Sequence, residues 1–146
     1  MHVQFATRQA AQTHPLRRFP ALDDLPHGEL VVLACGGTQI TLPAGRVVWH
    51  AGGLGRETLL VLDGEVRVDL DKQDVIVGAG HVVGEMAVLS RGRRTATVTT
   101  RSLVEGLVFT PSELCSVLRS APTFAGRVIA AYSLRLRGPG SDIASA

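Results

Sequence analysis

The spacing of hydrophobic residues changes twice along this chain of 146 residues. Ahead of residue 39, apolar positions recur at helical spacing and predict a short helix over 3–12 and a second helix over 26–35. Pro26 suits the first turn of the second helix, and Gly36 or Gly37 suits its end. The amino-terminal part of the chain is therefore expected to be helical.

Between residues 39 and 109 the hydrophobic period shortens to two, which is typical of strands. Turns rich in glycine and proline separate short runs of this kind, and Asp63-Gly64 is typical of a β-hairpin turn. The predicted strands cover 39–42, 46–49, 59–62, 66–70, 75–77, 81–83, 95–100 and 103–109. No helical pattern lies between these runs, as a parallel sheet would require. We expect an antiparallel β-barrel or jelly roll of about eight strands.

After residue 109 the pattern becomes helical again. Thr110-Pro111-Ser112-Glu113 has the composition of a capping box, and Leu114 and Val117 follow at the spacing of a buried helical face. Pro122 opens a second helical pattern, which stops at Gly138-Pro139-Gly140. The predicted fold class is mainly β with flanking helices, with an N-terminal helical segment, a barrel or jelly roll and two C-terminal helices.

The composition is that of a globular domain with little net charge, because 15 basic and 13 acidic residues give +2. This small excess does not indicate a nucleic-acid surface, which concentrates Lys and Arg on one face. No apolar run approaches the ~20 residues that span a bilayer, and the N-terminus lacks a signal-peptide pattern, so the expected location is cytoplasmic. Cys35 and Cys115 are too far apart for a CxxC motif, and we expect two reduced, buried thiols.

The stretch from Gly84 to Val98 contains the main candidate site. It places Glu85 nine residues before Arg94, across a turn, a short helix-like segment and the start of a strand. One loop can then present a carboxylate acceptor, backbone N–H donors and a guanidinium to the same small ligand. A ligand that matches all three groups combines an anionic phosphate with sugar hydroxyls.

This stretch reads Gly-Glu-Met-Ala-Val-Leu at 84–89 and Arg-Thr-Ala-Thr-Val at 94–98, and it resembles the phosphate-binding cassette of cyclic nucleotide-binding domains. The resemblance extends over three upstream turns, at 42–45, 62–66 and 78–80. It implies an N-terminal helical segment at 1–19, a cyclic nucleotide-binding domain at 20–137 and a flexible tail at 138–146.

The chain departs from the family's pattern at three places. An aromatic residue commonly stands where Val83 is, a proline often stands where Arg93 is, and 52–56 lacks the usual acidic residues. None of these positions is expected to touch the ligand directly, although the loop around Arg93 is expected to be looser. Arg91 and Arg93 are expected to be solvated loop charges.

The resemblance implies six ligand-binding residues: Gly84, Glu85, Met86, Ala87, Arg94 and Thr95. Gly84 would allow close approach of the backbone, and Glu85 would accept a hydrogen bond from the ribose 2′-hydroxyl. The next two residues would begin a short helix whose N–H groups meet the phosphate. Arg94 would bind a phosphate oxygen, with the backbone N–H of Thr95 as a further donor.

The implied ligand is cyclic AMP or cyclic GMP, with no other cofactor and no metal. The Thr95 hydroxyl could bond the guanine 2-amino group, but bacterial cyclic AMP binders also carry Ser or Thr at this place, so cyclic AMP is favoured. The last helix is expected to cover the purine. Its candidate residues are Tyr132, Leu134, Arg135 and Leu136.

Members of this family act as ligand-operated switches whose terminal helices act on an effector. The nine residues after Arg137 are too few for a helix-turn-helix module, so we expect no binding of nucleic acid by this chain alone and no membrane segment. The expected partner is an effector protein or a second copy in a homodimer. Met1 favours a true start, and a piece of a longer channel, transporter or enzyme stays open.

Two alternatives to the sensor hypothesis remain at this point. In a degenerate barrel, Glu85 and Arg94 would form only a structural ion pair, and the domain would serve as a protein-interaction module. A metal enzyme of the cupin type would use His50 and His81, but the chain has no His-x-His pair. No combination of Ser, Cys, His and acidic residues supports catalysis, so the chain is not expected to be an enzyme.

Overall fold

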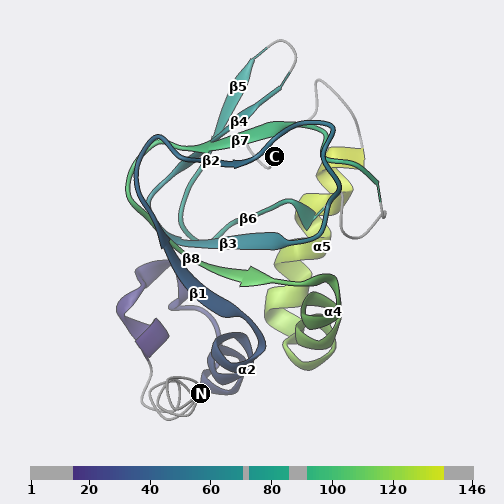
Figure 1. The fold of residues 1–146 in the computed structure, drawn as a ribbon. Helices are drawn as coiled ribbons and strands as arrows, with labels where there is room; N and C mark the ends of the chain where they lie inside the picture. The colour runs from purple at the N-terminus through teal and green to yellow at the C-terminus, as the bar shows by residue number, and fades with distance from the viewer. Residues whose placement is uncertain (1–14, 71–72, 86–91, 137–146) are drawn as a thin grey trace.

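The computed structural model describes residues 15–70, 73–85 and 92–136, with side chains to Ala131 in the last of these ranges. The helix expected at 3–12 and the tail at 138–146 lie outside the described residues. Within the described ranges the chain forms a β-barrel of two antiparallel sheets with helices at one end (Figure 1).

The predicted fold class is confirmed, since eight strands form two four-stranded sheets in the described residues. The strands are β1 Thr38–Leu42, β2 Val47–Trp49, β3 Thr58–Asp63, β4 Val66–Asp69, β5 Asp74–Val77, β6 Val82–Val83, β7 Thr97–Thr100 and β8 Val104–Phe109. Their order is β1-β8-β3-β6 in one sheet and β2-β7-β4-β5 in the other, and the paired strands are antiparallel. In Figure 1 the two sheets face each other across the barrel.

The hairpin predicted at Asp63-Gly64 is wrong, although the turn itself is present. β3 pairs with β6 and β8, whereas β4 pairs with β5 and β7, so the turn carries the chain from one sheet to the other. Gly64 has a φ of +94°, and a Cβ there would lie 2.3 Å from the carbonyl oxygen of Leu103. The glycine serves a tight crossing between sheets instead of a two-strand hairpin.

The helices begin close to the positions that the capping signals predict. They are the 3-10 turns η1 Pro15–Arg18 and η2 Pro20–Leu22, and the helices α2 His27–Gly36, α4 Pro111–Ser120 and α5 Pro122–Leu136. Pro26 is the residue before α2 and not its first residue. The capping box of α4 is present, because Thr110 Oγ1 accepts from Glu113 N at 3.1 Å and Thr110 N donates to Glu113 Oε1 at 2.9 Å. None of the helices in the described part of the chain is long and apolar enough to cross a bilayer.

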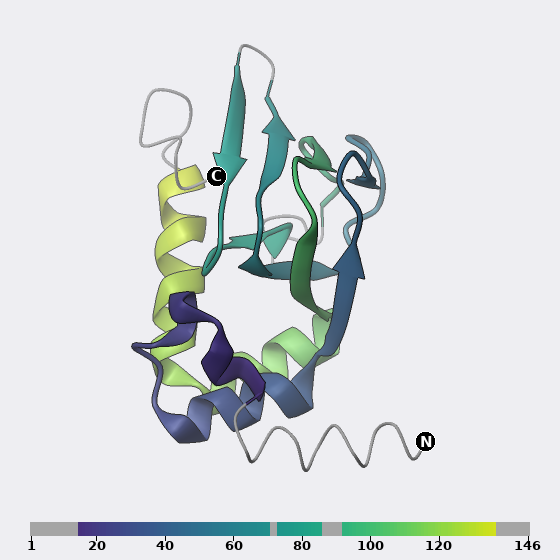
Figure 2. The same ribbon diagram turned by 90° about the vertical axis from the view of Figure 1, so that its left-hand side faces the viewer.

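Two apolar cores lie on opposite faces of the sheet that contains β3. Leu59 and Val61 belong to the core inside the barrel, and Leu60 and Leu62 belong to the core under the helices. This explains why β3 is a continuous apolar run, since both of its faces are covered. Figure 2 shows the helices gathered at one end, with α5 running up the side of the barrel. The helical core also includes Leu30, Leu33, Phe109, Leu114, Val117 and Phe124.

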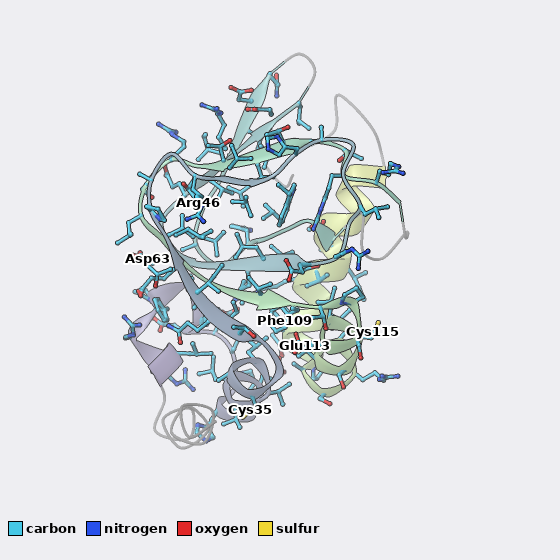
Figure 3. The ribbon with its side chains drawn as sticks, viewed as in Figure 1. Cys35, Arg46, Asp63, Phe109, Glu113 and Cys115 are labelled. Carbon is cyan, nitrogen blue, oxygen red and sulfur yellow. The ribbon has the colours of Figure 1, made fainter. Side chains whose placement is uncertain are left out.

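The prediction of buried thiols is wrong. Cys35 on α2 and Cys115 on α4 are both free and exposed (Figure 3). The inward faces of these helices are taken by larger residues, such as Leu33 on α2 and Leu114 on α4, which are fully buried. The cysteines therefore fall on the outer faces.

One carboxylate is buried among the helices. Glu29 on α2 is 6% exposed, and its Oε2 and Oε1 accept hydrogen bonds from Thr123 N at 3.0 Å and Phe124 N at 2.9 Å. These N–H groups belong to the first turn of α5, where backbone donors lack partners within the helix. Burial raises the pKa of Glu29, but the N–H bonds outweigh it and leave the pKa below its ordinary value. Glu29 thus caps α5 from another helix.

Candidate functional site

Gly84 follows β6 and adopts a backbone conformation that favours glycine, with a φ of +90°. A Cβ at this position would lie 2.4 Å from Arg94 Nη1 and 2.7 Å from Trp49 Cη2. Both the conformation and the space therefore require the absence of a side chain. The side chains that approach the Gly84 backbone closely are those of Arg94 and Trp49.

Glu85 comes next and is fully buried. It follows β6, whose Val82 and Val83 pair with Leu60 and Leu59 of β3. This short pairing fixes the chain just ahead of the Gly-Glu dipeptide. The Gly-Glu dipeptide thus places a buried carboxylate directly after a glycine with positive φ.

The backbone of Arg94 is held by the glycine-rich turn that follows β2. Arg94 N donates to Gly53 O at 2.7 Å, and Gly52 N donates to Arg94 O at 2.9 Å. The neighbouring residue Arg93 bridges to Leu54 in the same turn. The backbone of Arg94 is therefore held in place by the neighbouring turn.

The guanidinium of Arg94 lies inside the protein, with the residue 7% exposed. Its Nη1 donates to Gly84 O at 3.2 Å, and its Nη2 donates to Glu57 O at 2.7 Å. Nε has no hydrogen-bond partner within the described part of the chain. Since a guanidinium has five N–H donors, these contacts engage only some of them.

Trp49 covers one face of this guanidinium. The Cζ atom of Arg94 lies 3.7 Å from the centre of the Trp49 ring, which is a cation–π contact. Trp49 ends β2, and the register of β2 against β7 shifts between Val47 and Trp49. An irregularity of this kind redirects a side chain, as is common beside functional sites. Sequence reasoning missed Trp49, although it is the only tryptophan of the chain and precedes the glycine-rich turn closely.

The charge of Arg94 is desolvated by burial. Burial lowers the pKa of its guanidinium below the ordinary value, and the nearby charge of Glu57 offsets this only in part. The contacts described above are carbonyl oxygens and an aromatic face. Such a group gains from a monoanion that brings oxygen acceptors to its remaining donors.

The structure describes only some of the other predicted site residues. Thr95 is exposed and lies two residues before β7. Arg93 is exposed, as expected, and its Nη1 donates to Gly52 O at 3.0 Å. Met86, Ala87 and Arg91 lie outside the described residues. The candidate residues for covering the purine lie on α5, where their side chains are not described: Tyr132, Leu134, Arg135 and Leu136.

The structure gives no support to a metal site in the part of the chain that it describes. His50 and His81 are both exposed, and no three groups of the metal-binding kind come together among the described side chains. What the structure does bring together is Gly84, Arg94 and Trp49, with Glu85 next in the chain. This cluster is called the arginine site below.

The comparison with protein families identifies the class. A family model described as "Cyclic nucleotide-binding domain" matches residues 39–121, more than half of the chain. The chain therefore belongs to the cyclic nucleotide-binding domain family, as the cassette motif predicts. The matched region includes the whole arginine site.

Two relatives with similar sequences support this family assignment. A cyclic nucleotide-gated potassium channel of Rhizobium etli is 31% identical over 98 residues, which cover 67% of this chain and 28% of the channel. The cyclic AMP receptor protein of Thermus thermophilus is 30% identical over 101 residues, which cover 65% of this chain and 47% of that protein. The chain thus spans less than half the length of either relative.

A solved structure supports the fold over almost the whole chain. PKAR CBD2 with bound Sp-2Cl-cAMPS superimposes with a TM-score of 0.71, over 97% of each chain and at 18% identity. At this identity the likeness concerns the architecture of barrel and helices.

Proposed function

We propose that this chain is a cyclic nucleotide sensor whose preferred ligand is cyclic AMP. The observation that carries the proposal is Arg94, a buried guanidinium with unengaged donors beside a glycine of positive φ. A cyclic phosphate diester carries one negative charge and oxygen acceptors, which match this cation. Charge-assisted hydrogen bonds of this kind contribute about 1.5–3 kcal/mol each.

The other ligand contacts follow from the chain around Arg94. Glu85 would accept the ribose 2′-hydroxyl, and the backbone N–H of Thr95 would donate to the phosphate. Met86 and Ala87 would supply further N–H donors at the start of the cassette helix. The preference for cyclic AMP is supported by the relation to the cyclic AMP receptor protein of Thermus thermophilus.

We further propose that ligand binding is passed to the helices, because α5 contacts the segment that leads into the site. Arg127 on α5 donates to Gly80 O at 3.4 Å and to Ala21 O at 3.5 Å, and it forms an ion pair with Asp24. Gly80 N donates to Val61 O at 2.7 Å, and β6 then leads directly to the site. A shift of this segment would therefore change the contacts of α5 and of the amino-terminal turns.

The helices would act on an effector, which is a further part of the same or another protein, or on a second copy of the chain. No catalytic step, other cofactor or contact with nucleic acid is proposed. The proposed location is the cytoplasm, where the exposed free thiols of Cys35 and Cys115 would stay reduced.

The test is a pair of calorimetric titrations of the purified chain with cyclic AMP and cyclic GMP. Binding of cyclic AMP in the micromolar range or tighter is expected, with weaker binding of cyclic GMP. The variant Glu85→Ala should bind cyclic AMP and its 2′-deoxy analogue equally, whereas the unaltered chain should prefer cyclic AMP. If neither nucleotide binds, the sensor proposal is wrong.

A further inference from the structure

The proposed function leaves open how the buried charge of Arg94 is stabilised before a nucleotide binds. A buried cation needs compensation, since desolvation of an unpaired charge is costly. A carboxylate is the usual partner, but a carboxylate on the guanidinium edge would occupy the donors that a phosphate needs and would repel the phosphate. The compensation must therefore leave the edge of the guanidinium open.

Trp49 meets this condition by geometry. The N–H donors of a guanidinium all lie in its plane, so an aromatic ring stacked on the face stabilises the charge without using any donor. The ring centre of Trp49 lies 3.7 Å from Arg94 Cζ, at stacking distance. The carbonyls of Gly84 and Glu57 accept from Nη1 and Nη2, and Nε has no partner within the described residues.

Gly84 is part of the same arrangement. A side chain there would collide with the guanidinium at 2.4 Å and with the ring at 2.7 Å, so the glycine makes room for both. The stacked pair is thus enclosed by the backbone that leads into the cassette. A change in the position of one partner is expected to alter the other.

We propose that Trp49 is a positioning residue of the anion site, which holds the Arg94 guanidinium flat and charged with its edge free for a phosphate. This inference rests on the proposed function, and it adds a residue on β2 to a site otherwise built from the cassette. Trp49 acts through Arg94 and is not itself a ligand of the phosphate.

The test compares affinities for cyclic AMP by calorimetry. Trp49→Leu, which removes the aromatic face, should weaken binding about 5- to 30-fold. Trp49→Phe, which keeps a face, should restore affinity to within about threefold of the unaltered chain. Val47→Ala on the same strand, where the side chain is 42% exposed, is the matched control and should bind like the unaltered chain.

A double-variant cycle separates positioning from simple packing. Arg94→Lys replaces the planar cation by a compact ammonium, which a stacked ring holds less well. In this background Trp49→Leu should cost less than about twofold further, because the stacked pair is already broken. An equal loss in both backgrounds would show a packing role only and would overturn the inference.

Fluorescence gives a second measurement, since Trp49 is the only tryptophan. Arg94→Lys should change the emission of the ligand-free chain, and cyclic AMP should change that of the unaltered chain with the calorimetric dissociation constant. If the unaltered chain binds cyclic AMP and a folded Trp49→Leu variant binds it equally well, the inference fails while the proposed function stands. If the unaltered chain does not bind, the proposed function fails.

Discussion

Two buried ionisable side chains, one among the helices and one in the barrel, differ in how the protein stabilises their charge. Glu29 lies among the helices and is 6% exposed, and Arg94 lies at the barrel and is 7% exposed. The pKa of each is below its ordinary value. For an acid this means that the charged form is stabilised, whereas for a base it means that the charged form is destabilised.

The partners explain the difference. Both carboxylate oxygens of Glu29 accept N–H groups from the first turn of α5, at 2.9 and 3.0 Å, so the charge is matched inside the protein. Arg94 meets two carbonyl oxygens and the face of Trp49. The matched charge of Glu29 stabilises the fold, whereas the unengaged donors of Arg94 are those that we propose bind a ligand. The comparison predicts that changes at Glu29 affect stability and changes at Arg94 affect binding.

The largest expected effect is at Arg94. Arg94→Ala should weaken the binding of cyclic AMP by about 2–5 kcal/mol, because the phosphate would lose its cation in a buried site. Calorimetric titration measures this loss. Arg93→Ala is the matched control, since Arg93 is the exposed neighbour, and its effect should stay below about 0.5 kcal/mol. If both variants bind cyclic AMP as tightly as the unaltered chain, Arg94 is not part of the binding site.

The second effect is at Gly84. Gly84→Ala should cost about 1–3 kcal/mol from backbone strain, and the collision with Arg94 should appear as weaker binding of cyclic AMP. Gly45→Ala is the control, because Gly45 has a φ of +79° but open space around it. It should lower thermal stability and leave affinity unchanged. If Gly84→Ala also leaves affinity unchanged, the close approach at Gly84 has no role in the site.

The third effect is at Glu29. Glu29→Gln should lower the free energy of unfolding by about 2 kcal/mol at neutral pH, because one N–H of α5 would face an amide group instead of a carboxylate. The affinity of the folded protein for cyclic AMP should stay within about twofold of the unaltered chain. Urea unfolding followed by circular dichroism measures the first quantity, and calorimetry measures the second.

The pH dependence of this third effect has a definite sign. The folded pKa of Glu29 is lowered, so its contribution to stability is present above the ordinary carboxyl pKa of about 4.3 and is lost as the pH falls through the folded pKa. The difference from Glu29→Gln should therefore shrink in acid. Glu105→Gln is the control, since the Arg18–Glu105 pair lies at 3.2 Å with Arg18 largely exposed, and it should change stability by less than about 1 kcal/mol. A difference that is constant down to pH 3 would contradict the capping role.

Features that depend on local sequence are those that could be predicted. The strands match the predicted runs to within two residues, as at Val66–Asp69, because turns and alternation are local signals. The capping box at Thr110 and Glu113 is a contact over three residues and was predictable for the same reason. The family motif assigned Gly84 and Arg94 to one ligand site, but their contact with each other was not predicted.

Features that depend on distant contacts could not be predicted in this way. The Asp63-Gly64 turn has hairpin chemistry, but the pairing of β3 with β8 decides which sheet each strand joins. The bond between Glu29 and Phe124 links residues 95 positions apart. The stacking of Trp49 on Arg94 likewise joins the end of β2 to the segment ahead of β7, which no local pattern connects. In each case the partner is selected by the packing of the two sheets and the helices.

The most direct test of the central claim is the NMR signal of the Arg94 Nε–H group, assigned by its absence from the Arg94→Lys variant. The claim is that the unengaged edge of this guanidinium receives the phosphate of the nucleotide. Addition of cyclic AMP should shift this signal strongly, while adenosine, which has no phosphate, should leave it in place. A signal that does not move when cyclic AMP saturates the chain would contradict the claim.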